Sequence, residues 1–69
     1  MNNMTIEGNW LQLKGKVREQ WGKLTDSDMD QIAGKRDQLV GRITEHYGSS
    51  VEAVERELKD FERKQATTS

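Results

Sequence analysis

The chain contains no cysteine and no proline. Without cysteine it can form no disulfide, no thiolate nucleophile and no cysteine-based metal site. A domain of this size that lacks disulfides fits a reducing interior, so we expect a cytoplasmic protein. Without proline, and with a good supply of Gln, Glu, Lys, Arg and Leu, the sequence predicts an all-α fold.

Long apolar runs and an excess of one charge are also missing. No stretch approaches the roughly 20 apolar residues of a membrane span, and residues 1–10 have neither the basic start nor the apolar core of a signal peptide. Eleven basic and twelve acidic residues give a net charge of −1, which offers no general electrostatic case for nucleic acid. We expect one helical domain over residues 1–69, ordered from about 8–64, with frayed ends at 1–5 and 66–69.

What the sequence does contain is a repeated phrase. Residues 8–22 align with residues 34–48 without a gap, and six of the fifteen positions are identical. The identical pairs are Gly8/Gly34, Gln12/Gln38, Leu13/Leu39, Gly15/Gly41, Glu19/Glu45 and Gly22/Gly48. On a helix of about 100° per residue each copy carries one apolar stripe. This pseudo-repeat predicts a small four-helix bundle made of two similar α-hairpins that pack together.

The apolar spacing predicts helices at about 9–22, 26–33, 35–47 and 50–64. It leaves open whether the second helix runs into the third through Gly34. The residues expected to face the core are Trp10, Leu13, Val17, Trp21, Leu24, Met29, Ile32, Leu39, Val40, Ile43, Tyr47, Val51, Val54, Leu58 and Phe61.

Signals for the helix ends agree with this periodicity. Thr25 followed by Asp28 predicts a capping box at the start of the second helix. Gly22 and Gly48 follow the last stripe residue of each copy and predict left-handed helix stops. Further expected caps are Asn9 with Gln12, and Ser49 or Ser50.

Gly15 and Gly41 fall opposite the apolar stripes, near the middle of their helices. Each costs about 1 kcal/mol relative to Ala at such a position. One explanation is tolerated neutral history. The other is close packing of backbones, either between the two copies or against a partner helix, and the sequence does not separate these explanations.

A family resemblance rests on these same residues. The segment GNWLQLKGKVREQWGKLTDSDMDQIAGKRDQLVGRITEHYG resembles the CsbD-like stress-response proteins, through the glycines and the phrases GKV, WGKLT, GKRD and YG. The resemblance covers about residues 8–61, although Ala33 stands where we expect an acidic residue. It implies a bacterial cytoplasmic protein of the general stress response and a bundle of two α-hairpins similar to SAM-domain-like folds. The family has no assigned catalytic or ligand residues to carry over.

The sequence predicts no catalytic, cofactor or metal site. His46 is the only histidine, and we expect it at the surface or at the boundary of the core. The acidic residues of segment 26–30 resemble the start of a calcium loop. However, the sixth and twelfth loop positions hold Gln31 and Asp37 instead of Gly and Glu, so an acidic helix start is the better interpretation.

Basic residues on the first helix suggest one other function. Lys14, Lys16 and Arg18 lie close to Trp10 and Trp21 in sequence, and basic residues beside aromatics can hold phosphate and stack bases. Core packing explains the two tryptophans better, and a solvated face explains the basic residues better. A helical nucleic-acid-binding module that uses the basic faces of the first and third helices is therefore the alternative hypothesis.

The favoured hypothesis is a non-enzymatic stress-response protein that acts by binding or by protecting other molecules. The mean hydropathy of −0.99 and the low apolar content are similar to those of hydrophilins, which are thought to protect molecules during water loss. The sequence does not identify a partner, and both a protein partner and self-association are compatible with the glycine-bearing faces.

Overall fold

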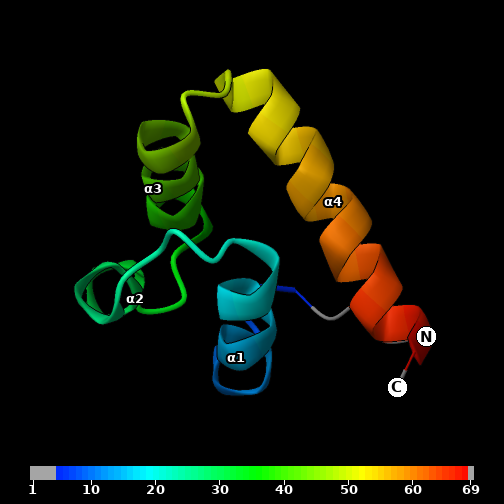
Figure 1. The fold of residues 1–69 in the computed structure, drawn as a ribbon. Helices are drawn as coiled ribbons and strands as arrows, with labels where there is room; N and C mark the ends of the chain where they lie inside the picture. Colours follow the sequence, from blue (N-terminus) through cyan, green and yellow to red (C-terminus); the bar gives the residue numbers. More distant parts are fainter. Residues whose placement is uncertain (1–4, 69) are drawn as a thin grey trace.

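The computed structural model describes residues 5–68, and these form four helices and no strand (Figure 1). They are α1 (Trp10–Gln20), α2 (Asp26–Ile32), α3 (Arg36–Tyr47) and α4 (Val51–Thr68). The all-α prediction is confirmed. The predicted helix end at residue 64 is wrong, because α4 continues to Thr68. The fraying expected at residues 1–4 and 69 falls outside the described residues.

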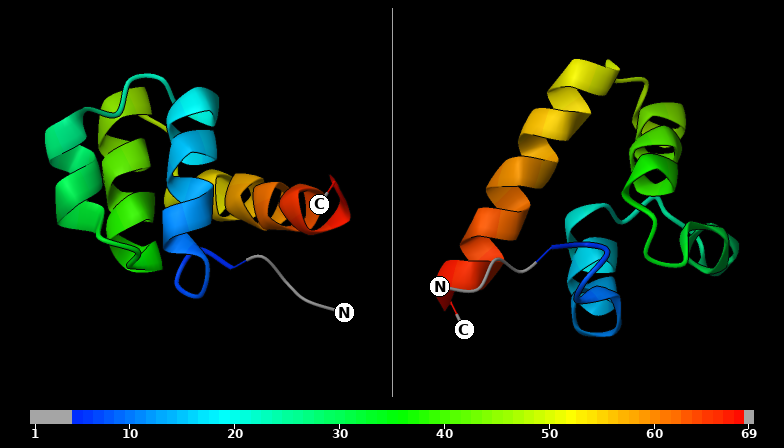
Figure 2. Two further views of the ribbon diagram at one scale, coloured as in Figure 1. Left: turned by 90° about the horizontal axis from the view of Figure 1, so that it is seen from below. Right: turned by 180° about the vertical axis from the view of Figure 1, so that it is seen from behind.

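Helix α3 is central, with α2 packed on one side of it and α4 on the other (Figures 1 and 2). Helix α1 lies beside this group and reaches α4 through its C-terminal end, where the Trp21 and Phe61 rings lie 5.3 Å apart. The closest helix pairs are thus α2 with α3 and α3 with α4. The predicted pairing into two hairpins is not confirmed, and the pseudo-repeat stays a prediction.

The core draws on all four helices and on the segment before α1. Its buried side chains are Ile6, Leu13, Val17, Trp21, Leu24, Met29, Ile32, Leu39, Val40, Ile43, Val54, Leu58 and Phe61. Ile6 was not predicted because it lies outside any periodic segment. Its backbone N–H donates to the Glu62 carboxylate at 2.9 Å, which fixes the start of the described chain against α4.

Three expected core residues lie at the edge instead. Trp10 is half-buried and packs against the core, whereas Tyr47 is 37% exposed and Val51 is 51% exposed. The Tyr47 hydroxyl accepts a hydrogen bond from the Lys23 backbone N–H at 3.1 Å, and the Lys23 ammonium lies 4.9 Å from the ring centroid. A tyrosine with one apolar and one wet side suits this boundary position. Val51 is the first residue of α4 and precedes the part of the helix that meets the core.

Two of the predicted caps are present. The Thr25 side chain accepts from the Asp28 backbone N–H at 3.1 Å, and the Asp28 carboxylate accepts from the Thr25 backbone N–H at 2.9 Å. This is the predicted capping box. At the start of α4, the Ser50 hydroxyl accepts from the Ala53 backbone N–H at 3.2 Å. Both caps satisfy backbone donors that have no partner within their own helix.

The predicted Asn9 cap is wrong. Asn9 makes no side-chain capping bond, because its ψ of 33° differs from the extended conformation that aims a cap side chain at the first turn. Its amide group instead lies 3.4 Å from the Gln12 side-chain oxygen.

The predicted stop is correct at one glycine and wrong at the other. Gly48 ends α3 with a φ of 67°, as a left-handed stop requires. Gly22 has no positive φ, because Trp21 has already left the helix with a φ of −121°. Between α2 and α3, Ala33 and Gly34 both take positive φ values, of 46° and 85°. These two residues separate α2 from α3, which answers the question that the sequence left open.

Candidate functional site

One polar cluster links α2 to α3. Asp28 is the only buried charged side chain among the described residues, at 7% exposure. The His46 Nε2 atom lies 2.6 Å from its carboxylate, and an Arg42 guanidinium nitrogen lies 3.6 Å away. The hydrogen bond from the Thr25 backbone lowers the pKa of Asp28 against the opposing effect of burial, and the His46 contact lowers that pKa further.

The geometry of α3 explains why two of its side chains meet the Asp28 carboxylate. Arg42 and His46 are four residues apart and therefore share one face of the helix. Arg42 also contacts the Gln31 side chain of α2 and lies 3.8 Å from Glu45. His46 is half-buried, which agrees with the expectation of a histidine at the boundary of the core. Its contact with Asp28 was not predicted, because the two residues are 18 positions apart and only the fold brings them together.

This cluster joins two helices through one carboxylate. A search of residues 5–68 finds no group of three or more His, Asp or Glu side chains that could hold a metal ion. The acidic residues that resembled a calcium loop diverge: Asp28 turns inward to α3, whereas Asp26 points outward and pairs with Arg18. Asp28 therefore has a structural role at the joint between two helices.

The outward side of α1 carries a different set of residues. We call Leu11, Lys14, Gly15 and Arg18 the outer face of α1, because helical geometry places them together and away from the buried Leu13 and Val17. Leu11 is 88% exposed, more than any other large apolar side chain in the part of the chain that is described. A Cβ atom added at Gly15 would meet nothing within 4 Å.

Gly41 on α3 is equally open, since a Cβ atom there also meets nothing within 4 Å. Gly15 and Gly41 therefore do not bring backbones together within residues 5–68. The sequence suggested two kinds of close packing at these glycines. Packing of the two repeat copies against each other has no support in this arrangement. Packing of either glycine against a partner helix stays a prediction.

The three basic residues predicted as phosphate contacts do not share one face. Lys14 and Arg18 are neighbours, four residues apart, but Lys16 lies about 160° around the helix from both. Arg18 is also engaged in an ion pair with Asp26. The structure thus brings together Lys14 and Arg18 but not Lys16. Of these two neighbours, Lys14 has no ion pair inside the described chain.

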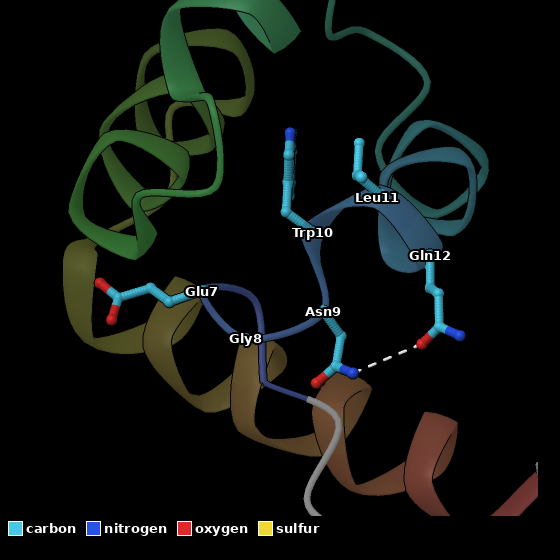
Figure 3. A pocket seen from close by; sticks show the side chains of 6 residues that line it. All are labelled: Glu7, Gly8, Asn9, Trp10, Leu11 and Gln12. Atoms are coloured by element: carbon cyan, nitrogen blue, oxygen red, sulfur yellow. Dashed lines mark hydrogen bonds between the residues drawn. The ribbon is translucent and has the colours of Figure 1, made fainter.

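A shallow hollow lies at the start of α1, beside the outer face. Its volume is about 460 Å³, and residues 7–12 line it (Figure 3). Figure 3 shows the Trp10 and Leu11 side chains projecting toward the same side, away from the Asn9 and Gln12 amides. The hollow is open to solvent, and its lining combines the apolar Trp10 and Leu11 with polar side chains from Glu7, Asn9 and Gln12.

In the described part of the chain, no helix combines the length and the apolar character needed to cross a membrane.

Fold and site together define a small all-α protein in which the buried Asp28 joins α2 to α3 and Leu11 of α1 is the most exposed large apolar side chain in the described part of the chain. Comparison with known proteins identifies the family: residues 5–56 match the CsbD-like family, and the chain belongs to it. A UPF0337 protein of Pectobacterium atrosepticum is 61% identical over 62 residues, which are 90% of each chain. The UPF0337 protein YjbJ of Escherichia coli K12 is 60% identical over the same shares.

The similarity extends to a third relative. A UPF0337 protein of Protochlamydia amoebophila is 50% identical over 64 residues, which cover 93% of this chain and 97% of the relative. The chain and its relatives therefore correspond over nearly their whole lengths.

Proposed function

We propose that this protein is a non-enzymatic member of the bacterial general stress response, and that it acts by binding a protein partner through the outer face of α1. Membership of the CsbD-like family supports the stress-response assignment. The observation that carries the binding role is the 88% exposure of Leu11 on the outer face of α1.

The residues around Leu11 suit a partner helix. Burial of one leucine side chain contributes about 1.5–3 kcal/mol to an association. Gly15 follows one helical turn later, and its lack of a side chain lets a second backbone come close. Lys14 adds a positive charge with no ion pair in the described chain, which favours an acidic residue beside the apolar anchor of the partner.

Crosslinking and affinity capture from stressed cells, with the full chain as bait, test this role. Leu11→Ser and Gly15→Leu each change the outer face without touching the core, and we expect each to reduce capture of a specific partner at least tenfold. Val51→Ser is the matched control, since Val51 is also an exposed apolar residue but lies on α4. Equal capture by wild type, Leu11→Ser and Val51→Ser would contradict binding through α1.

A second form of the proposal is that the protein protects other molecules as hydrophilins do, which requires no specific partner. The mean hydropathy of −0.99 supports it. A labile enzyme dried or frozen with the protein would then keep its activity equally well with wild type and with Leu11→Ser. Protection that disappears in Leu11→Ser supports binding, because this variant changes one apolar contact and leaves the hydrophilic surface intact.

Nucleic-acid binding remains the alternative from a different class. It predicts a mobility shift at low salt that weakens steeply as salt rises. Lys14 and Lys16 lie on opposite flanks of α1. If one flank faces the phosphates, Lys14→Gln and Lys16→Gln should weaken the mobility shift to different degrees. The absence of any shift at low salt would rule out this function.

A further inference from the structure

One carboxylate performs two structural tasks. Asp28 closes the capping box of α2 by accepting from the Thr25 backbone N–H at 2.9 Å. The same group contacts His46 at 2.6 Å and Arg42 at 3.6 Å on α3. The local stability of α2 and its attachment to α3 therefore depend on the same negative charge.

Helix α2 depends strongly on such support. It has only seven residues, and isolated helices shorter than about 12–15 residues are marginal in water. It lies at the outside of the molecule, on the side of α3 away from α4 (Figure 2). Apart from Asp28, it is held by the buried side chains of Met29 and Ile32 and by the exposed contact between Gln31 and Arg42. Loss of the Asp28 charge thus weakens the capping box and the contacts with His46 and Arg42 at the same time.

We propose that Asp28 is an acid-operated latch: its protonation releases α2 from α3 while α3 and α4 stay folded, and exposes the apolar surface formed by Met29, Ile32 and the side of α3 that they cover. This inference does not depend on the proposed function, because it concerns a conformational change and not a partner.

The charged groups around Asp28 determine the direction of the effect. Arg42 and His46 face it from α3, and Glu45 lies 3.8 Å from Arg42. Once Asp28 is neutral, the carboxylate that remains beside Arg42 is that of Glu45, which is largely exposed and therefore replaces the buried charge poorly. On α2 itself, Asp26 and Asp30 point outward, and Asp26 pairs with Arg18 of α1. These outer contacts involve exposed side chains and contribute little.

The pKa of Asp28 sets the pH window. Its folded pKa lies below the ordinary carboxyl value, which is about 3.9 in an unfolded chain. The stabilisation is therefore fully present above about pH 4 and is lost as the pH falls through the lower folded pKa. Release of α2 is expected below pH 4, and the attached state is expected at neutral pH.

Backbone NMR shifts of the full-length protein between pH 7 and pH 2 test the latch. We expect the Cα shifts of α2 to lose their helical values first, while those of α3 and α4 remain helical over at least half a pH unit more. The transition of α2 should coincide with titration of the Asp28 carboxyl carbon. Loss of helical shifts in all four helices at one pH would overturn the proposal, because it would show ordinary cooperative unfolding.

Two variants and one control identify the group responsible. Asp28→Asn should release α2 already at pH 7 and remove its acid transition. His46→Gln should keep the fold and shift the α2 transition to higher pH, because it removes a contact that lowers the pKa of Asp28. Asp30→Asn alters an exposed carboxylate of the same helix and should leave the transition unchanged. A shift of that transition by Asp30→Asn, or none by His46→Gln, would contradict the assignment to Asp28.

Discussion

At the scale of single residues, Ala33 is the clearest case of backbone strain. It caps the end of α2 with a φ of 46°, in the left-handed region that costs an L-residue about 1–2 kcal/mol. Its side chain is exposed, so little packing would be lost on its removal. We expect Ala33→Gly to raise the free energy of unfolding by about 0.5–1 kcal/mol, measured by urea denaturation.

A second variant at the same position tests whether backbone strain, rather than the loss of the Ala33 methyl group, explains the change in stability. Ala33→Val places a β-branched side chain in the left-handed region and should lower the free energy of unfolding. If Ala33→Gly destabilises the protein instead, the positive φ is not a source of strain. The family resemblance led us to expect an acidic residue here, but it gave no indication of the positive φ.

At the scale of helices, two caps that look alike in sequence differ in the structure. Thr25 has a φ of −98° and a ψ of 169°, and its side chain accepts from the first turn of α2. Asn9 makes no such bond. We expect Thr25→Ala to cost about 1 kcal/mol of stability, whereas Asn9→Ala should change it by less than half of that. Circular dichroism during urea denaturation measures both, and equal losses would contradict the difference in capping.

Substitution of the two mid-helix glycines should raise stability, whereas removal of the cap lowers it. Gly15 and Gly41 lie inside α1 and α3 with open space around them, so Gly15→Ala and Gly41→Ala should each stabilise the fold by up to about 1 kcal/mol. Gly34→Ala is the contrast: its φ is 85°, and the added Cβ would lie 3.1 Å from the Trp10 Cβ atom. We expect that variant to be destabilised, and thermal melts of the three proteins provide the comparison.

The difference between local and tertiary signals explains what the sequence could predict. The caps at Thr25 and Ser50 and the stop at Gly48 depend on a few neighbouring residues, and they were predicted correctly. The local predictions at Asn9 and Gly22 were wrong, because the backbone at both ends of α1 departs from the geometry that a cap or a left-handed stop requires. The contact between Asp28 and His46 depends on how α2 lies against α3, which no local pattern encodes. Tyr47 occupied a stripe position, but the loop at Lys23 gave its hydroxyl a partner at the surface.

At the scale of the whole molecule, a core made from so short a chain leaves little reserve. About 0.05–0.15 kcal/mol per residue corresponds to roughly 3–10 kcal/mol of total stability for the 69 residues. Leu58 is fully buried at the centre of α4, and a Leu→Ala change in a core costs about 2–5 kcal/mol. Leu58→Ala should therefore unfold a large fraction of the protein.

Leu11→Ala makes the same chemical change on the outer face of α1. Because Leu11 is 88% exposed, its truncation should alter the free energy of unfolding by less than about 0.5 kcal/mol. Urea denaturation of both variants, followed by the fluorescence of the buried Trp21, measures the contrast. If Leu11→Ala leaves the free energy of unfolding unchanged but abolishes capture of the partner, then the inward side of α1 serves the fold and its outward side serves binding. A loss above 1 kcal/mol would mean that Leu11 serves the fold, and the binding role would then lose its main support.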